Sequence, residues 1–227
     1  MMSWLPEGVS TFAPQIDRLF YGIYYLTGAV FFAVQITLLV FVFRYRHRPD
    51  RRAEYTHGNT TLEIVWTVVP AIILVVLAFV SRSTWANIKE RIPPSDFEMG
   101  VTAKQFNWEA HYAGPDGKVG TDDDVVMDND VYVPVNKTIR VVLRSKDVIH
   151  SFFVPSMRFK QDAVPGHEIP IWFKVTKPGK YEIPCAELCG FGHSGMRGWL
   201  HVLPQEEFEA WAKEHKIGST APAAAHG

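Results

Sequence analysis

The sequence predicts an α+β membrane protein in which an N-terminal two-helix transmembrane hairpin precedes a Greek-key β-barrel. Two apolar runs of near-spanning length lie in the first third of the chain, and short β-type segments separated by turns follow. We divide the chain into an N-terminal segment and hairpin at 1–92 and a β-domain with a short C-terminal helix at 93–217. A small, Pro/Ala-rich tail at 218–227 is expected to be disordered.

The two apolar runs predict membrane spans at about 20–45 and 62–82. Phe20–Phe43 contains 24 residues without a charge, enough for a helix to cross about 30 Å of hydrocarbon. Leu62–Val80 contains Pro70, which a membrane helix tolerates better than a soluble one, and Glu63 is its only ionisable residue. A buried hairpin of a soluble protein is the alternative, and the spanning length of both runs disfavours it.

The loop between the runs predicts the orientation in the membrane. Its charged residues are Arg44, Arg46, His47, Arg48, Arg51 and Arg52, opposed by Asp50 and Glu54. Because basic loops stay cytoplasmic, we expect both termini and the β-domain on the periplasmic side of a bacterial inner membrane. The first residues lack a basic start followed by an apolar run, so no secretory signal is expected.

The β-domain is predicted from β-branched or alternating segments bounded by turn residues. These segments are Val131–Val135, Thr138–Leu143, Ile169–Val175 and Gly198–Leu203, with turns at Asn136-Lys137, Pro165-Gly166 and Lys177–Gly179. Regular short strands of this kind are typical of a sandwich or Greek-key barrel. Gln205–Lys216 predicts a short amphipathic helix.

Composition excludes two functions. The chain has 23 basic and 24 acidic side chains, which argues against a nucleic-acid-binding protein. It has no Cys-x-x-Cys-His, so no covalently attached haem is expected in this chain.

The segment Cys185–Met196 predicts a metal site, because it holds two thiols, an imidazole and a thioether. Such soft donors select copper over magnesium or calcium, although zinc and a structural disulfide are alternatives. Two thiolates can bridge a pair of copper ions, and each copper then needs one imidazole. His150, which we place at the end of an apolar strand Val141–Ile149, is the leading candidate for the second imidazole.

Four segments resemble subunit II of the haem–copper cytochrome oxidases, and the resemblance covers nearly the whole chain. They are Thr61–Thr67, Asp147–Phe152, Lys160–Gly166 and Cys185–Met196. The resemblance implies a cupredoxin-like barrel and a dinuclear copper centre called CuA. Its implied ligands are the bridging thiolates of Cys185 and Cys189, the imidazoles of His150 and His193, the thioether of Met196 and the backbone carbonyl of Glu187.

The resemblance implies two further sites where this chain would contact subunit I. The Glu187 side chain would reach a magnesium ion at the seam with subunit I. Glu63 would lie at the mouth of a proton channel in subunit I, although a carboxylate at a helix edge can simply reach water. The implied partners are oxidase subunits I and III, membrane lipid and a separate c-type cytochrome.

The implied activity is electron transfer, since electrons from the cytochrome would pass through CuA to the haem of subunit I, where oxygen is reduced. The family usually carries a cluster of aromatics here, one of which, commonly a Trp, admits electrons. This chain departs from that pattern, because Phe106 falls at that place and Trp108 follows two residues on. Both would share one strand face if this segment is extended. Core packing is the alternative for both. The Asp-rich stretch 114–130 could steer a basic cytochrome or bind calcium, but a solvated loop is favoured.

Three other functions share some of these features. A quinol oxidase subunit II has the fold without the copper ligands. A membrane-anchored copper carrier needs exposed, exchangeable ligands. The copper domain of nitrous oxide reductase is soluble, so the two predicted spans count against it.

Overall fold

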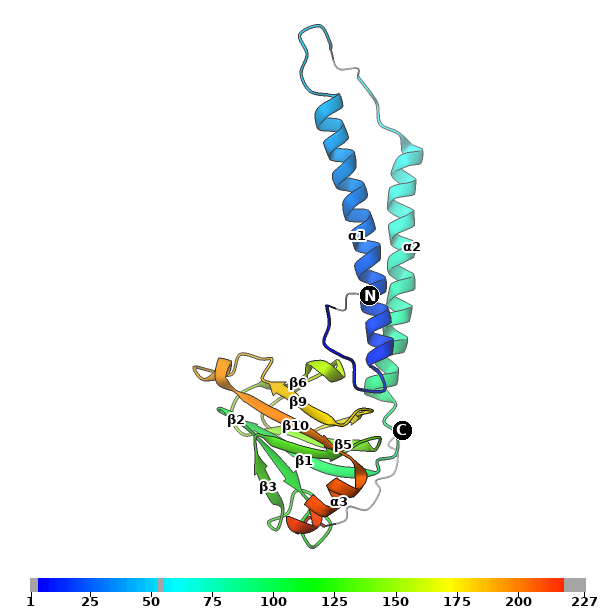
Figure 1. Cartoon of the computed structure of the whole chain (residues 1–227). Coiled ribbons are helices and arrows are strands. Elements are labelled where there is room, and N and C mark those ends of the chain that lie inside the picture. The colour runs from blue at the N-terminus through cyan, green and yellow to red at the C-terminus, as the bar shows by residue number, and fades with distance from the viewer. Residues whose placement is uncertain (1–3, 53–54, 219–227) are drawn as a thin grey trace. The chain divides into compact units, whose positions relative to one another are not determined.

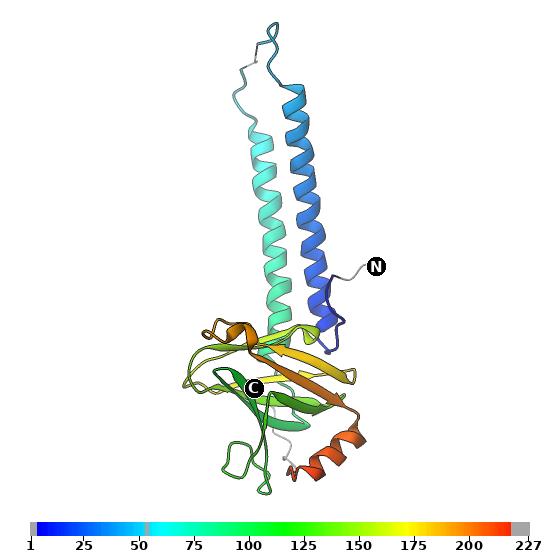
Figure 2. The same cartoon turned by 60° about the vertical axis from the view of Figure 1, so that its left-hand side comes forward.

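The computed structural model of the protein describes residues 4–52 and 55–218, and these form two compact units (Figures 1 and 2). One unit, Gln15–Trp85, is the helical hairpin. The other joins the N-terminal segment up to Pro14 to the β-domain from Ala86 onward. Most of the tail predicted to be disordered, residues 219–227, lies outside the described residues.

The hairpin consists of α1 (Ala13–Arg44) and α2 (Thr60–Trp85), which run side by side in both views. Each helix begins before the predicted span, and α2 continues into a π-helical turn, η1 (Ala86–Glu90). The Asn59 side chain accepts a hydrogen bond from the Leu62 amide at 3.0 Å, which caps the start of α2.

The apolar faces of the hairpin are not covered by the chain itself. Both helices are long and apolar enough to span a membrane, and none of the most apolar window of either helix is buried. Side chains of this kind need hydrocarbon or other helices around them. The hairpin therefore has the surface of a membrane anchor rather than that of a soluble core.

The β-unit contains three sheets among the described residues. Its strands are β1 (Phe97–Lys104), β2 (Asn107–Tyr112), β3 (Val125–Asp128), β4 (Asp130–Pro134), β5 (Thr138–Ser145), β6 (His150–Val154), β7 (Phe159–Ala163), β8 (Ile169–Lys174), β9 (Gly179–Pro184) and β10 (Arg197–Leu203). Its short helices are η2 (Pro155–Met157), η3 (His193–Gly195) and α3 (Gln205–Glu214). The largest sheet has the order β3-β2-β1-β5-β8, the second has the order β4-β10-β9, and β6 pairs with β7.

The predicted fold class, a transmembrane hairpin followed by a cupredoxin-like barrel, is confirmed. The four strand segments read from the sequence correspond to β4, β5, β8 and β10. Strands β1 and β5 pair in parallel, as do β4 and β10. The chain passes to the second sheet at β4 and returns to the first at β5. The other strands were not predicted individually, because polar or charged residues interrupt their apolar pattern.

Large aromatic side chains fill the space between the sheets. Trp108, Tyr112, Phe152 and Phe173 are fully buried. The Tyr112 hydroxyl accepts a hydrogen bond from the Tyr132 amide at 2.6 Å and donates one to the Tyr132 carbonyl at 3.1 Å. Burial raises the pKa of Tyr112, so its hydroxyl keeps the proton that it donates. This one polar group thus ties β2 to β4 inside the core.

The N-terminal segment packs into the β-unit. Val9 and Phe12 are buried, and Ser10 forms a β-bridge with Val175. The Thr176 amide donates to the Val9 carbonyl at 2.7 Å. The sequence-based division at 1–92 groups this segment with the hairpin instead, because a short stretch with prolines has no periodicity that would reveal its partner.

Replacing Tyr112→Phe should lower the free energy of unfolding of the β-unit by about 1–3 kcal/mol, because the Tyr132 amide and carbonyl lose their buried partner. Chemical unfolding of the full chain in detergent, followed by tryptophan fluorescence, measures this. Tyr181→Phe is the matched control, since the Tyr181 hydroxyl bonds the Lys177 carbonyl at an exposed position. An equal effect of both changes would contradict the role given to Tyr112.

Candidate metal centre

The predicted ligand segment forms a closed loop between two paired strands. The Cys185 amide donates to the Met196 carbonyl at 3.1 Å, directly beyond the last ladder pair, Pro184 with Arg197. The loop therefore begins and ends at one point of the β9–β10 hairpin. Inside it, the one-turn helix η3 begins at His193.

Both cysteines are free thiols, and both are buried. The two Sγ atoms lie 3.9 Å apart. A disulfide requires about 2.05 Å, whereas two thiolates that share a metal at about 2.3 Å each can lie near this separation. The structure thus favours a metal over the disulfide alternative.

His150 reaches the thiols from a separate pair of strands. A β-bridge joins Phe152 to Cys185, and the Ala186 amide donates to the Ser151 carbonyl at 3.1 Å. As a result, His150 Nδ1 lies 3.8 Å from Cys185 Sγ, and the imidazole is fully buried. The prediction that His150 ends a strand 141–149 is wrong. Strand β5 ends at Ser145, and His150 begins β6 after a turn.

The remaining predicted donors converge on the same place. His193 Nδ1 lies 3.6 Å from Cys189 Sγ, and Met196 Sδ lies 3.8 Å from the same sulfur. The Glu187 carbonyl oxygen lies 3.2 Å from Cys185 Sγ. Each thiol therefore has its own imidazole, and the thioether and the carbonyl stand beside different thiols. Donor atoms of His150, Cys185 and Cys189 all fall within 4.8 Å of one another.

Burial shapes the protonation of these groups. Burial, together with the neighbouring Cys185, raises the pKa of the Cys189 thiol to about 11. A metal that binds here therefore has to displace thiol protons. Asp147 accepts from His150 Nε2 at 2.8 Å. Burial opposes ionisation of Asp147, but this bond and those from the Gln105 and Val148 amides hold its pKa below the usual value.

Two residues of the surroundings were missed by the sequence analysis as parts of the site. Asp147 orients His150 so that Nδ1 faces the sulfur, a common arrangement of metal-binding histidines. Its position three residues before the histidine is a signal that could have identified it. Gln105 donates from its side chain to the Cys189 carbonyl, and nothing in the sequence indicates this contact.

Phe106 and Trp108 occupy different environments. Phe106 lies in the turn between β1 and β2, is 39% exposed, and packs against Gly192 of the ligand loop. Trp108 is on β2, fully buried, with its ring centroid 6.2 Å from that of His150. The expectation that both share one strand face is wrong, because the chain turns at Phe106.

Glu63 lies in the hairpin unit and not in this centre. It occupies the first turn of α2, where a helix N-terminus favours a negative charge. The Glu187 side chain is exposed, while its carbonyl faces the thiols.

The Asp-rich stretch uses its carboxylates to hold its own loop. Asp123 accepts from the Thr121 hydroxyl and the Asp116 amide, and Asp124 accepts from the Gly120 amide. Among the residues that the structure describes, the acidic side chains of this loop do not gather into a metal-binding group. This arrangement favours the solvated loop over calcium binding.

The donor set fits copper. Two thiols, two imidazoles, a thioether and a backbone carbonyl lie close together in this centre. The thioether is a soft ligand, which copper binds more readily than zinc does. The centre is buried except near His193 and the exposed loop residues Leu188 and Phe191. It can hold a redox metal close to a surface, as electron transfer requires.

Comparison with known proteins agrees with this geometry. The family model "Cytochrome C oxidase subunit II, transmembrane domain" matches residues 1–83, and "Cytochrome C oxidase subunit II, periplasmic domain" matches residues 109–201. The chain is 30% identical to the alternative cytochrome c oxidase subunit 2 of Bradyrhizobium diazoefficiens, over 94% of this chain and 84% of that one. It is 31% identical to the cytochrome c oxidase subunit 2 of Thermostichus vulcanus, over 96% and 80% of the two chains.

A solved structure is also similar. The periplasmic domain of subunit II of the cytochrome oxidase of Bradyrhizobium japonicum is 31% identical, with a TM-score of 0.49. The match covers 55% of this chain and 96% of that domain.

The close contact of Gly192 with Phe106 allows the packing of the ligand loop to be tested by substitution. A Cβ at Gly192 would lie 2.5 Å from Phe106 Cδ2, so Gly192→Ala should displace the ring or the loop and cost about 1–3 kcal/mol. We expect less copper retained by the purified chain after dialysis, and a lower thermal midpoint. Gly195→Ala is the control, because a Cβ there meets no atom within 4 Å. Equal copper retention by both variants would contradict this packing.

Proposed function

The chain belongs to the subunit II family of the cytochrome c oxidases, and we propose that it takes electrons from a c-type cytochrome through a dinuclear copper centre, CuA. As a member of this family the chain is a membrane-bound subunit of a haem–copper oxidase. The observation that supports a dinuclear copper centre most strongly is the pairing of two thiols with two separate imidazoles. His150 stands beside Cys185 at 3.8 Å and His193 beside Cys189 at 3.6 Å.

We assign to the centre the six donors that the family resemblance implies. The thiolates of Cys185 and Cys189 and the imidazoles of His150 and His193 would hold the two copper ions. Met196 and the Glu187 carbonyl would be the weaker donors. The bound copper pair supplies a one-electron relay in which the change of charge is shared by two metals.

The chain's own part in electron transfer is to hold these donors still. The loop is closed by the Cys185 to Met196 hydrogen bond, and the His150 ring is held by Asp147. The β-bridge to Phe152 joins the two halves of the site. Donors fixed in this way move little when charge arrives, which lowers the reorganisation needed for transfer.

Phe106 is the better candidate for the electron-accepting aromatic. It is partly exposed and touches the ligand loop, whereas Trp108 is sealed in the core beside His150. A cytochrome docked on this face would contact Phe106 before any buried aromatic. Trp108 then serves to pack the His150 ring.

The remaining assignments concern the contacts that the chain would make with the other subunits of the oxidase and with the membrane. The exposed Glu187 carboxylate would help to hold magnesium at the seam with subunit I, and Glu63 would stand at the mouth of a proton channel there. Subunit III and membrane lipid are further neighbours. The arginine-rich loop would lie in the cytoplasm of a bacterium, and the β-unit with both termini in the periplasm.

The rival functions fit less well. A quinol oxidase subunit does not need the donors that converge here. A copper carrier needs exposed ligands, but His150, Cys185 and Cys189 are all buried. The match of residues 1–83 to a transmembrane family counts against the soluble nitrous oxide reductase.

Electron paramagnetic resonance of the copper-loaded full chain tests the proposed centre. We expect hyperfine lines from two equivalent coppers that share one electron. Cys189→Ser should abolish this pattern because one bridge is lost, whereas Met196→Leu should keep it because only a weak ligand is lost. A mononuclear spectrum, or a chain that retains zinc alone, would overturn the proposal.

Oxidation of a reduced c-type cytochrome by the holoenzyme tests the role of Phe106. Phe106→Leu should slow the reaction several-fold with copper content unchanged. Trp108→Phe is the comparison, because Trp108→Ala would cost about 3–5 kcal/mol in the core. If Phe106→Leu leaves the rate unchanged, the electron enters elsewhere.

A further inference from the structure

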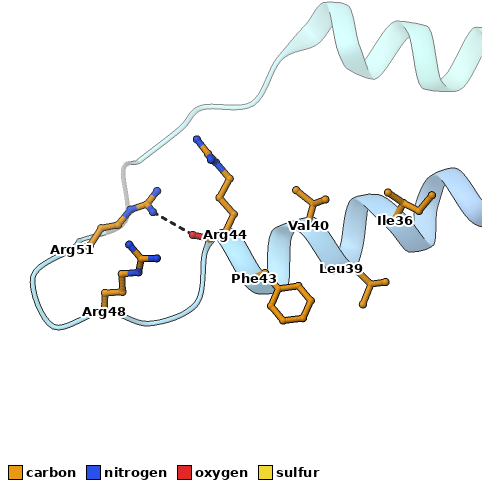
Figure 3. A pocket seen from close by; sticks show the side chains of 7 residues that line it. All are labelled: Ile36, Leu39, Val40, Phe43, Arg44, Arg48 and Arg51. Atoms are coloured by element: carbon orange, nitrogen blue, oxygen red, sulfur yellow. Dashed lines mark hydrogen bonds between the residues drawn. The ribbon is translucent and has the colours of Figure 1, made fainter.

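The end of α1 and the loop after it form a pocket with an apolar floor and a cationic rim (Figure 3). The cavity measures about 580 Å³ and is lined by Ile36, Leu39, Val40, Phe43, Arg44, Arg48 and Arg51. The four apolar residues follow the i, i+3, i+4, i+7 spacing of one helix face. All of the lining residues belong to the hairpin unit, so the pocket lies wholly within that unit.

One hydrogen bond brings the arginines together. Arg51 Nη1 donates to the Arg44 carbonyl at 3.3 Å, at the helix end where carbonyls lack partners within the helix. The loop thereby folds back on α1. Figure 3 shows the Arg48 and Arg51 side chains next to each other near the end of the helix.

The positive charges of this rim are not neutralised by the described part of the chain. No ion pair between described residues involves Arg44, Arg48 or Arg51. Three guanidinium groups on one small pocket repel one another. Arginine binds phosphate with two parallel hydrogen bonds, so a phosphate is the anion that this rim suits best.

The floor adds a second requirement on the ligand. Leu39 and Phe43 are 56% and 67% exposed, so the apolar face is not covered by the chain. It continues from the rim into the uncharged stretch Phe20–Phe43. Arg44 is thus the first charged residue after the apolar span, at the depth where lipid phosphates lie.

We propose that this pocket binds an anionic phospholipid, with its phosphate held by Arg44, Arg48 and Arg51 and an acyl chain along Ile36–Phe43. The combination of an anionic head and an apolar tail matches the rim and the floor together. A free phosphate would leave the floor uncovered, and a zwitterionic lipid would leave part of the rim charge unmatched.

A second hollow of the same loop provides a matched control. It shares Arg48 and Arg51 with the first and is lined by Tyr45, Arg46, His47, Arg48, Arg51, Arg52 and Thr56. It has arginines but no aliphatic floor. Arg46 and Arg52 belong to this hollow alone, so their removal lowers the charge of the loop equally without changing the proposed site.

Native mass spectrometry of the full chain in detergent, titrated with phosphatidylglycerol, tests the rim. Arg48→Gln with Arg51→Gln should weaken binding by at least about tenfold, and Arg46→Gln with Arg52→Gln by about twofold or less. Far-UV circular dichroism confirms that both variants keep their helices. An equal loss in the two variants would mean diffuse attraction to the loop and would overturn the proposal.

A pair of uncharged changes tests the floor and does not depend on the arginines. Leu39→Asn should weaken phosphatidylglycerol binding, whereas Leu38→Asn, next to it but outside the pocket, should not. Phosphatidylcholine should bind more weakly than phosphatidylglycerol, and millimolar inorganic phosphate should not displace the lipid. Displacement by phosphate, or equal effects at Leu38 and Leu39, would show that no lipid site exists here.

Discussion

The metal centre depends on one antiparallel contact, the β-bridge between Phe152 and Cys185. The two cysteines, His193 and Met196 belong to a single loop and need only local folding to meet. His150 is 35 residues away from Cys185 along the chain, and the bridge, with the Ala186 to Ser151 hydrogen bond beside it, brings it to the thiols. Without this contact the loop would offer one imidazole to two thiols. The proposed site for two metals therefore depends on the barrel and cannot form from the loop alone.

The residues that surround the donors hold the ligand loop Cys185–Met196 in its conformation. Gln105 donates a hydrogen bond to the Cys189 carbonyl, and the Phe106 ring lies so close to Gly192 that a side chain there would have to displace the ring or the loop. Asp147 fixes the ring of His150 from the opposite side. These contacts come from the β1–β2 turn and the β5–β6 turn, which lie far from the loop in the sequence. The surface that would meet an electron donor is thus built from the same residues that hold the ligands.

The hairpin follows a different physical rule, because its apolar side chains are not buried by the chain that carries them. Its apolar surface suits hydrocarbon or other helices, and its arginine-rich end suits phosphate groups. The change from uncharged residues to arginines takes place within one helical turn at Phe43 and Arg44. That abrupt change positions the proposed lipid pocket where apolar and anionic surroundings meet.

The sequence by itself determined the membrane hairpin, four of the strands and the soft-donor loop, because each is a local pattern of period, charge or ligand type. It also made His150 the leading candidate for the second imidazole, although on the wrong strand. Tertiary structure alone decided which thiol each imidazole faces, that Phe106 is exposed and Trp108 buried, and that residues 9–12 join the β-unit. These outcomes depend on pairing between strands distant along the chain, and short segments such as β6 and β7 carry no periodicity that specifies their partners. Local patterns can thus specify what a residue is able to bind, while its neighbours are set by the register of the sheets.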